Sequence, residues 1–449
     1  METPIYNFLI EYSKKNFLRA HMPGHKGISP VPELMNLYSF DITEISGADS
    51  LFEADGIIRK SEQNASLLFG TEETVYSCGG STLCIQAMLY LMKQENRRVI
   101  AGRTVHKAFL NACILLGIEV TWIYPKEENG ILSGKFDPTD FEKALRDIKD
   151  QPCCVYITSP DYLGNMADIE SLAKVSHRHN APLLVDNAHG AHLAFFRDNI
   201  HPMALGADLC CDSAHKMLPC LTGCAYLHTS NKKYKGRLKG AMSMFGSTSP
   251  SYLMLLSLDL CNVFLQNEAK KNIERVIKTI EEMKKRLQNK YIFTGGRDPF
   301  HIVIDTASMG ICGKDLAKAL ERLDCFAEYA GTEAVVLLLS AAEKAENLVR
   351  LYNALQQCSG FIKSENMAQK PPSFTQPSVM MNMREAALAE SKIIPVENAV
   401  GRICAGVRVP CPPAVPIVIS GEVIDQSTAD VLRFYNINEI EVVKYSQTT

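Results

Sequence analysis

Features that would indicate a membrane, a nucleic acid or a secretion pathway are missing from this 449-residue sequence. No uninterrupted apolar run reaches the roughly 18 residues that a membrane-spanning helix needs. The amino terminus, METPIYNFLIEYSKKN, lacks the basic-then-apolar order of a secretion signal. There is no block of Lys and Arg, and a formal net charge of -3 gives no general attraction to nucleic acid or anionic lipid. We therefore expect a cytoplasmic protein that binds neither nucleic acid nor membrane.

Cysteine is plentiful, but the spacing that would make it informative is absent. None of the 15 cysteines is arranged as C-x-x-C, and the pairs Cys153-Cys154 and Cys210-Cys211 are adjacent within apolar, strand-like runs. Neither a zinc site nor a disulfide framework is indicated by this pattern. We expect these cysteines to be reduced and to act as small hydrophobic core residues.

Strand-like and helical patterns alternate from about Thr74 onward. TVYS precedes a glycine turn and an amphipathic helix, RRVIAG and IEVTWIYP flank another helix, and QPCCVYITSP and APLLVD flank a third. Such alternation predicts an α/β fold with a mostly parallel sheet covered by helices on both faces.

The length suggests more than one domain. We predict an N-terminal segment and large domain over residues 1–290, which ends in a helix-rich connector over 251–289. A smaller α/β domain is predicted over 291–365. A linker rich in Pro, Ser and Gln (364–380) then leads into a carboxy-terminal domain within 366–449.

Polar side chains follow several predicted strands, at the carboxyl ends where open α/β sheets bind ligands. The first group is GGST, residues 79–82, which leads directly into a predicted helix. Glycines such as Gly80 let the backbone approach an anion, the first amides of the helix point at it, and Ser81 and Thr82 add hydroxyl donors. This is a candidate phosphate cradle, although the same residues could simply cap an ordinary helix.

Histidines and an acid follow two further predicted strands. His106 comes after RRVIAG, and Asp186 ends APLLVD shortly before His189 and His192. An aspartate at the tip of a buried strand needs a cationic partner, because burying a charge costs free energy. His189 and His192 have a spacing that metal ligands can have, but the sequence places no third ligand nearby, so we predict no metal site.

Lys216 raises the central question, because it lies in a long, weakly charged segment that is expected to be buried, where an ammonium must be paired or neutralised. An anion cradle, a strand-end acid, an aromatic histidine and a lysine at one sheet edge are the parts that hold pyridoxal 5'-phosphate (PLP). We predict that Lys216 forms an imine with PLP and that Asp186 pairs with the pyridine nitrogen. Ser81 and Thr82 would hold the phosphate, and His106 would stack on the ring.

Eight segments occur in the order of one known family: HMPGHKG (21–27), DITEISGADSLFEADGII (41–58), GGST (79–82), RTVHK (103–107), DNAHGAH (186–192), SAHK (213–216), STSPSY (247–252) and VPCPPAVPIVISGE (409–422). Along nearly the whole chain the sequence resembles the fold-type I Orn/Lys/Arg decarboxylases, in the short form without an amino-terminal wing domain.

The resemblance implies a large PLP-binding domain, a small α/β domain and a carboxy-terminal domain, assembled as a homodimer or higher oligomer with active sites at the interface. It implies four catalytic residues: His106, Asp186, His215 and Lys216. The implied cofactor-binding residues are Gly80, Ser81, Thr82, His106, Asp186, His189, Ser213, His215, Lys216, Ser247 and Thr248. Of these, Ser247 or Thr248 would reach the phosphate of the neighbouring subunit.

The implied activity is decarboxylation of lysine, arginine or ornithine to the corresponding amine and CO2, with Lys216 or His215 returning a proton to Cα. A distal cation on the substrate needs an anion. The acidic residues Asp41, Glu44, Asp49, Glu53 and Asp55 could supply it, or could belong to a solvated loop or a helix cap.

Six residues depart from the family's usual text, and some of them lie in segments that could contact substrate: Ser50, Phe52, Ala108, Asn187, Cys411 and Ala414. The predicted reaction class is therefore better supported than the substrate. The cofactor residues also do not choose which bond breaks, so transamination, elimination or aldol cleavage stays an alternative. A non-catalytic protein that binds PLP or an amino acid is another, and a metal hydrolase built on His189 and His192 is the most remote.

Overall fold

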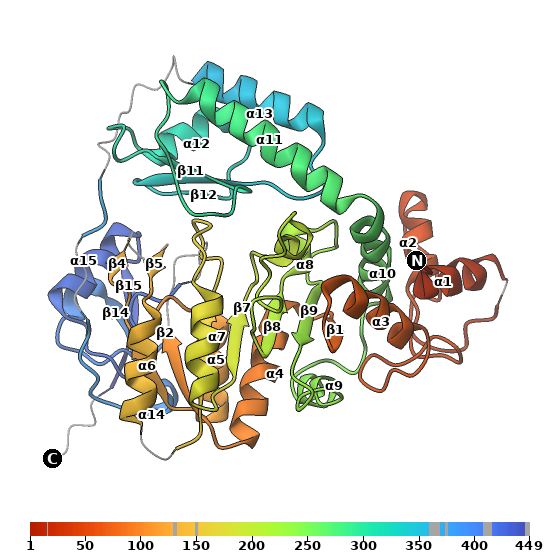
Figure 1. Cartoon of the computed structure of the whole chain (residues 1–449), viewed down its shortest axis with the longest axis horizontal. Helices are drawn as coiled ribbons and strands as arrows, with labels where there is room; N and C mark the ends of the chain where they lie inside the picture. The colour runs from red at the N-terminus through yellow and green to blue at the C-terminus, as the bar shows by residue number, and fades with distance from the viewer. Residues whose placement is uncertain are drawn as a thin grey trace. The chain divides into compact units, whose positions relative to one another are not determined.

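The computed structural model describes residues 1–15, 17–128, 133–148, 151–358, 369–372, 376–406 and 415–444 (Figure 1). Contacts within the chain divide it into two units. Unit 1 comprises Met1–Glu95, Ile169–Arg275 and Ser340–Ala342, and unit 2 comprises Asn96–Asp168, Val276–Leu339 and Glu343–Thr449. Each unit thus combines segments that are distant in sequence. The domain boundaries after residues 290 and 365 stay a prediction.

The strands of unit 1 lie in the order β1-β9-β8-β7, with β1 at Glu73–Ser77, β9 at Ala225–Thr229, β8 at Leu209–Asp212 and β7 at Leu183–Asp186. β7 and β8 pair in parallel, whereas β9 is antiparallel to both β8 and β1. β1 therefore runs in the same direction as β7 and β8. The carboxyl ends of these three strands consequently lie at the same edge, which is where ligands bind in open α/β sheets.

The helices of unit 1 surround these strands. They are α1 (Pro4–Lys14), α2 (Met35–Phe40), α3 (Ile57–Phe69), α4 (Gly80–Gln94), α7 (Ile169–Arg178), α8 (Ala214–Met217), α9 (Leu238–Ser243), α10 (Tyr252–Asn267) and the beginning of α11 (Ala269–Leu287), with short 3₁₀ turns at Pro32–Leu34 and Ala191–Phe195. The predicted helix-rich run over 251–289 is confirmed as the two helices α10 and α11.

Helix α4 differs from the amphipathic helix that the sequence predicted. Eight of its residues are buried, and they lie around most of its circumference: Leu83, Cys84, Ile85, Ala87, Met88, Leu89, Leu91 and Met92. The helix contacts β7, β8 and β9 on one side and α9 on another. Because α9 covers a face that would otherwise meet water, α4 is an internal helix whose first turn is held rigidly at the sheet edge.

Unit 2 contains a second group of parallel strands. β6 (Cys153–Thr158), β2 (Arg98–Gly102) and β3 (Val120–Ile123) lie in the order β6-β2-β3, and both pairs are parallel. Helix α5 (Lys107–Leu116) connects β2 to β3, and α6 (Pro138–Asp147) packs against both strands. A short hairpin joins β4 (Glu127–Glu128) to β5 (Gly134–Lys135). The α/β fold with mostly parallel strands that the sequence predicted is therefore confirmed.

A separate antiparallel sheet in unit 2 has the order β10-β11-β13-β12. Its strands are β10 (Phe293–Thr294), β11 (His301–Asp305), β12 (Tyr329–Ala330) and β13 (Ala334–Leu338). Helix α12 (Gly313–Glu321) packs on β12 and β13, and α13 (Ala345–Cys358) packs against α12 (Figure 1). These elements confirm the smaller α/β layer that was predicted from this part of the sequence.

The carboxy-terminal part of unit 2 contains α14 (Met383–Leu388), β14 (Ser391–Pro395), a 3₁₀ turn at Val396–Asn398, α15 (Gln426–Phe434) and β15 (Glu439–Val443). β14 and β15 pair in an antiparallel fashion over their own buried cluster, which includes Val418, Leu432 and Ile440. Of the predicted linker, residues 369–372 and 376–380 are described and form no helix. Cys411 and Ala414 lie outside the described residues.

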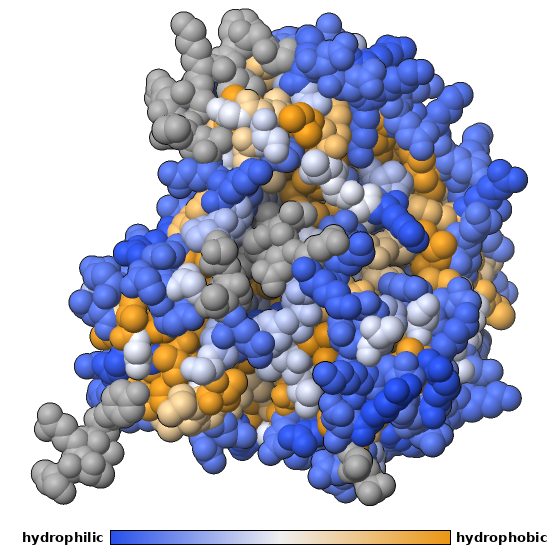
Figure 2. Space-filling model, turned by 60° about the vertical axis from the view of Figure 1, so that its left-hand side comes forward, coloured by the Kyte–Doolittle hydropathy of each residue, from blue (hydrophilic) through white to orange (hydrophobic). Residues whose placement is uncertain are grey.

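The adjacent cysteines behave as predicted. Cys153 and Cys154 in β6 and Cys210 and Cys211 in β8 are buried free thiols. Burial raises the pKa of Cys210 and Cys211 well above the usual range, so both stay protonated. In the described part of the chain no helix is long and apolar enough to cross a membrane. Figure 2 shows a face where hydrophilic residues predominate and hydrophobic residues form small groups between them.

Candidate active site

Lys216 lies just beyond the carboxyl end of β8. Ser213 is the N-cap of the single-turn helix α8, and Lys216 is in its last turn. The segment around it is buried as predicted, but Lys216 itself is half-buried rather than fully buried. Its Nζ atom lies 2.9 Å from His189 Nε2. A partly exposed lysine amine beside a histidine nitrogen is the kind of group that can form an imine with a carbonyl compound.

Asp186 ends β7 at the same sheet edge and is only 1% exposed. Its Oδ1 atom accepts a hydrogen bond from the backbone N–H of Ala188 at 3.2 Å and one from the Cys211 thiol at 3.7 Å. Both donors are neutral. A buried carboxylate at a strand end favours a cation beside it, and a protonated pyridine nitrogen is one such cation.

The turn after β1 has the geometry of an anion cradle. Gly80 adopts φ +66°, a left-handed conformation that favours glycine, and its N–H donates to Gly223 O at 2.8 Å. The N-cap of α4 is Gly79, and no side chain caps the helix. The hydroxyls of Ser81 and Thr82 are therefore not used as helix caps, which removes the simpler interpretation of GGST. In the first turn of α4, Gly80 N–H is taken by Gly223 O and Leu83 N–H by Gly79 O, so the N–H groups of Ser81 and Thr82 are the ones placed to bind an anion.

Ser213 joins the lysine segment to this turn. Its hydroxyl donates to Ser81 Oγ at 2.8 Å. The hydroxyl pair connects the residue after β8 with the first turn of α4, so the loop that carries Lys216 and the candidate phosphate cradle are adjacent. His215, half-buried in the same loop, places Nδ1 3.0 Å from Cys224 O, which favours the tautomer with its proton on Nδ1.

His106 lies in unit 2, directly after β2. It is the N-cap of α5, and its Nδ1 atom accepts from the backbone N–H of Ala108 at 3.1 Å. The hydrogen bond fixes the ring plane at the carboxyl end of a parallel strand. The predicted stacking of His106 on a cofactor ring stays a prediction, as do the cofactor contacts of Ser247 and Thr248, which lie exposed in the loop between α9 and α10.

A buried cluster that the sequence did not predict supports the lysine loop from within unit 1. Asp212 is fully buried at the end of β8 and accepts from His201 Nε2 at 2.9 Å, His228 Nε2 at 3.1 Å and Asn187 Nδ2 at 2.6 Å. Although burial raises its pKa, the two histidines outweigh burial and lower the pKa of Asp212 overall. Asp212 is therefore an ionised anchor immediately before Ser213. Its partners come from three separate strand ends and loops, so no local motif marks them.

This cluster also explains why Asn187 stands where the family text has glutamate. The Asn187 amide donates to Asp212 Oδ1 at 2.6 Å, whereas a glutamate there would bring a second carboxylate against a buried one. The neutral amide of Asn187 is thus complementary to the buried carboxylate of Asp212.

The remote metal-site alternative finds no support at the residues that suggested it. Among the described residues, the one group of His, Cys, Asp and Glu close enough to hold an ion is His201, Cys210 and Asp212, and it contains neither His189 nor His192. His189 instead contacts Lys216, and His192 is buried beside Phe196 with ring centroids 5.4 Å apart.

The acidic residues considered for the substrate's distal cation fall into two groups. Asp49 accepts backbone N–H groups of Ser50, Asp55, Gly56, Ile58 and Arg59 at 2.9–3.3 Å, which makes it the capping residue of α3. Asp41 pairs with His25 Nε2 at 3.1 Å. Glu44, Glu53 and Asp55 are exposed; Glu44 accepts from Thr43 Oγ1 at 2.7 Å and Glu53 from Ser50 Oγ at 3.4 Å.

Comparisons with known proteins identify the family of this chain. The chain matches the model for "Orn/Lys/Arg decarboxylase, major domain" over residues 3–305 and the one for "Orn/Lys/Arg decarboxylase, C-terminal domain" over residues 363–443. It is 29% identical to an arginine decarboxylase of Bacillus anthracis, over 96% of this chain and 92% of that protein.

The fold also matches solved structures at low sequence identity. Lysine decarboxylase A from Pseudomonas aeruginosa has a TM-score of 0.83 at 16% identity, covering 98% of this chain and 80% of that one. A serine palmitoyltransferase from S. paucimobilis with a bound PLP-myriocin aldimine has a TM-score of 0.54 at 14% identity, covering 68% and 77%. The fold is thus the fold type I of PLP enzymes. Because the major-domain model covers well over half of its residues, this chain belongs to the Orn/Lys/Arg decarboxylase family, whose members act on amino acids with PLP as cofactor.

Proposed function

We propose that this protein decarboxylates a basic amino acid to the corresponding amine and CO2. The observation that carries the proposal is the convergence, at one edge of the unit 1 strands, of a reachable lysine amine, a buried carboxylate and a hydroxyl-lined helix start. In a chain of this family, these three parts match the aldehyde, the ring nitrogen and the phosphate of PLP.

The residues that would hold PLP follow from their chemistry. Lys216 would bind the aldehyde carbon covalently, and Asp186 would keep the ring nitrogen protonated. Ser81 and Thr82 would hold the phosphate through backbone N–H groups and hydroxyls, Ser213 would add a hydroxyl, and Gly80 would give the turn its left-handed backbone. His106 would cover one face of the ring, and His189, bonded to Lys216 Nζ, would orient the amine.

PLP, when bound, supplies an electron sink for the electrons of the Cα–carboxylate bond. The remaining steps belong to the protein. Asp186 maintains the positive charge that makes the sink effective, because its buried carboxylate favours the protonated nitrogen. Lys216, whose Nζ atom lies 2.9 Å from His189 Nε2, would be the first candidate to return a proton to Cα. His215 is the second candidate for that proton transfer.

Arginine and lysine are the first substrates to test. Relatives that align over most of this chain are named arginine decarboxylase, and the structural neighbours at lower identity are named lysine decarboxylase. Glu44, Glu53 and Asp55 are the exposed acidic residues of the 41–58 segment, and they would be the ones to meet a guanidinium or ammonium group. The same proposal includes a homodimer in which Ser247 and Thr248 of each subunit contact the cofactor phosphate of the other. It also includes a location in the cytoplasm.

The test is a panel of single amino acids with the PLP-loaded protein, read out as CO2 and amine. We expect release of both from arginine, lysine or ornithine, and loss of both in Lys216→Ala together with the absorption band of the lysine-bound cofactor. Lys174→Ala, at an exposed lysine of α7, is the matched control. Formation of a keto acid instead of CO2 would assign another PLP reaction, and turnover that persists in Lys216→Ala would remove the proposal.

A further inference from the structure

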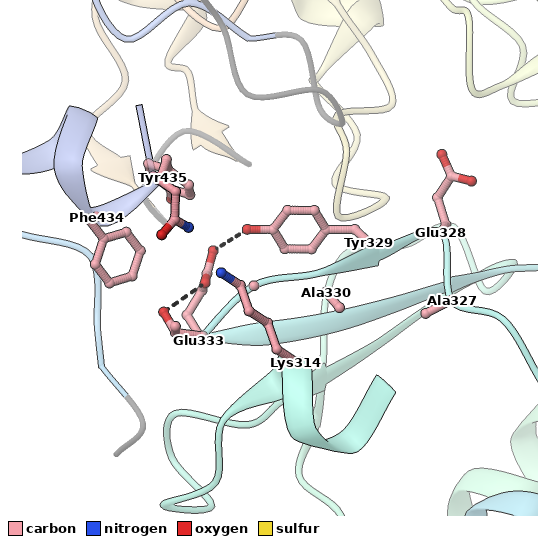
Figure 3. A pocket seen from close by; sticks show the side chains of 11 residues that line it. Lys314, Ala327, Glu328, Tyr329, Ala330, Glu333, Phe434 and Tyr435 are labelled. Atoms are coloured by element: carbon pink, nitrogen blue, oxygen red, sulfur yellow. Dashed lines mark hydrogen bonds between the residues drawn. The ribbon is translucent and has the colours of Figure 1, made fainter. Parts of the chain in front are cut away.

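Unit 2 contains a cavity that the proposed reaction does not use. It has a volume of about 310 Å³, within the range of small-molecule sites. One wall is formed by the start of α12 and the turn from β12 to β13, and the other by residues 434–436 at the end of α15 (Figure 3). None of the predicted cofactor or catalytic residues lines it.

A buried carboxylate faces this cavity without a cation bonded to it. Glu333 is 8% exposed, and Tyr329 OH donates to its Oε1 atom at 2.6 Å, with Thr332 Oγ1 at 3.5 Å from Oε2. Burial raises the pKa of Glu333; Lys314 lowers it only slightly, by charge and without a hydrogen bond. The backbone N–H of Glu333 itself is a third donor, and all three donors are neutral, so the desolvation of the carboxylate is incompletely offset. A cationic group in the cavity would offset it.

Aromatic rings form the rest of the wall. Tyr329 stands beside Glu333, and Phe434 and Tyr435 lie across from it, with their ring centroids 5.0 Å apart and their planes at 83° (Figure 3). Ring faces and edges at different angles suit an alkyl chain that ends in a cation, because the chain packs on the rings and the cation is attracted to a ring face.

The charges that line the cavity specify more than a simple amine. The cavity is lined by two carboxylates, those of Glu328 and Glu333, and by one ammonium, that of Lys314. The complementary ligand carries two cationic groups and one carboxylate, which is the charge pattern of a basic amino acid. A diamine would leave Lys314 without a counter-charge.

We propose that this cavity is a second binding site for a basic amino acid, distinct from the candidate active site. Glu333 would bind one cationic group, Lys314 the α-carboxylate, and Glu328 at the rim the other cation. This inference rests on the proposed function in one respect: if the protein decarboxylates a basic amino acid, the ligand of this second site belongs to the same class as the substrate. Substrate could then bind to the protein at a place where it is not consumed.

Calorimetric titration tests the proposal on PLP-loaded protein reduced with borohydride, which blocks Lys216. Arginine, lysine, agmatine and 1,5-diaminopentane are the probes. We expect arginine or lysine to bind more tightly than its amine, and Glu333→Gln to weaken binding by about tenfold or more. Lys314→Met should remove the preference for the amino acid over the amine. Glu321→Gln and Lys318→Met, exposed changes on the same helix, should stay within about twofold of wild type.

Absence of binding by the reduced wild-type protein would overturn the second site, and so would equal affinity for amino acid and amine. Unchanged binding in Glu333→Gln would do the same. Glu333→Gln keeps the size of the side chain and can still accept the hydrogen bond from Tyr329, so it is expected to fold. Lys314→Met changes an exposed residue and tests the ligand preference independently. The two proposals fail separately: protein that releases CO2 but does not bind after reduction loses only the second site, and protein that binds but releases no CO2 loses only the decarboxylase assignment.

Discussion

Glu422→Gln would break a buried ion pair that holds the loop leading to His106. Arg103 follows β2 directly, and its NH2 atom lies 3.1 Å from Glu422 Oε2, with the two side chains 5% and 0% exposed. Arg103 also donates to Pro416 O at 3.1 Å. The pair therefore joins the carboxyl end of β2 to the carboxy-terminal part of unit 2, three residues before the predicted stacking histidine.

The size of the effect follows from burial. Removing one partner of a buried pair leaves the other charge uncompensated, which costs about 3–5 kcal/mol. Burial raises the pKa of Glu422 in spite of Arg103, so the pair does not fully offset the cost of burying its own charges. We therefore expect the double variant Arg103→Met/Glu422→Gln to be more stable than Glu422→Gln alone, because it removes the orphaned charge.

Scanning calorimetry measures this directly. A destabilisation of about 3–5 kcal/mol in a domain of roughly 150–250 residues lowers the melting temperature by about 6–20 °C. The control is Glu170→Gln, which breaks the exposed pair with Lys174, where the side chains are 62% and 67% exposed and water screens the charges. PLP content of each variant reports whether the loop of His106 is displaced.

Two results would refute this reasoning. A melting temperature of Glu422→Gln as close to wild type as that of the control would mean that the pair contributes no more than a surface one. A double variant that melts below both single variants would mean that its destabilisation comes from lost packing and not from an unpaired charge.

Three further predictions concern carboxylates of unit 1. Asn187→Asp would place a second carboxylate beside Asp212 instead of the 2.6 Å hydrogen bond, and we expect it to lower the free energy of unfolding by about 2 kcal/mol. The melting temperature of this variant should fall further below that of wild type at pH 8 than at pH 5. A difference in melting temperature that does not change with pH would contradict the charge argument. Asp49→Ala should lower the free energy of unfolding by about 1–2 kcal/mol through loss of the α3 cap, while the KM for substrate stays unchanged. A raised KM at unchanged stability would show instead that Asp49 binds the substrate. Burial raises the pKa of Glu62 from 4.5 to about 7 in spite of Lys239. The folded state thus keeps a proton that the unfolded state has lost, and the wild-type protein should lose up to about 3 kcal/mol as the pH rises from 4.5 to 7. Glu62→Gln should show a flatter stability profile in urea titrations over that range, and an equally steep one would exclude Glu62 as the source.

The candidate site was largely predictable because its parts are local signals at a topologically defined place. A glycine turn before a helix, an acid at a strand tip and a lysine after an apolar strand can each be recognised in sequence, and parallel strands bring their carboxyl ends to one edge. The half-exposure of Lys216 was not predictable, and the sequence offered a helix cap for the acidic residues of 41–58 without identifying Asp49 as the one, because both depend on contacts with segments that the local pattern does not identify.

By itself, the sequence determined the alternation of strands and helices and the family, and it predicted which residues would bind PLP, since these depend on local periodicity and on short motifs in order. Only the tertiary structure decided that Asp212 accepts hydrogen bonds from His201, His228 and Asn187. It also decided that Glu333 faces residues of α15 about a hundred positions away in the sequence. These groups share no sequence neighbourhood, and their pKa values and ligand preferences depend on burial and on distances that exist only after the chain has folded.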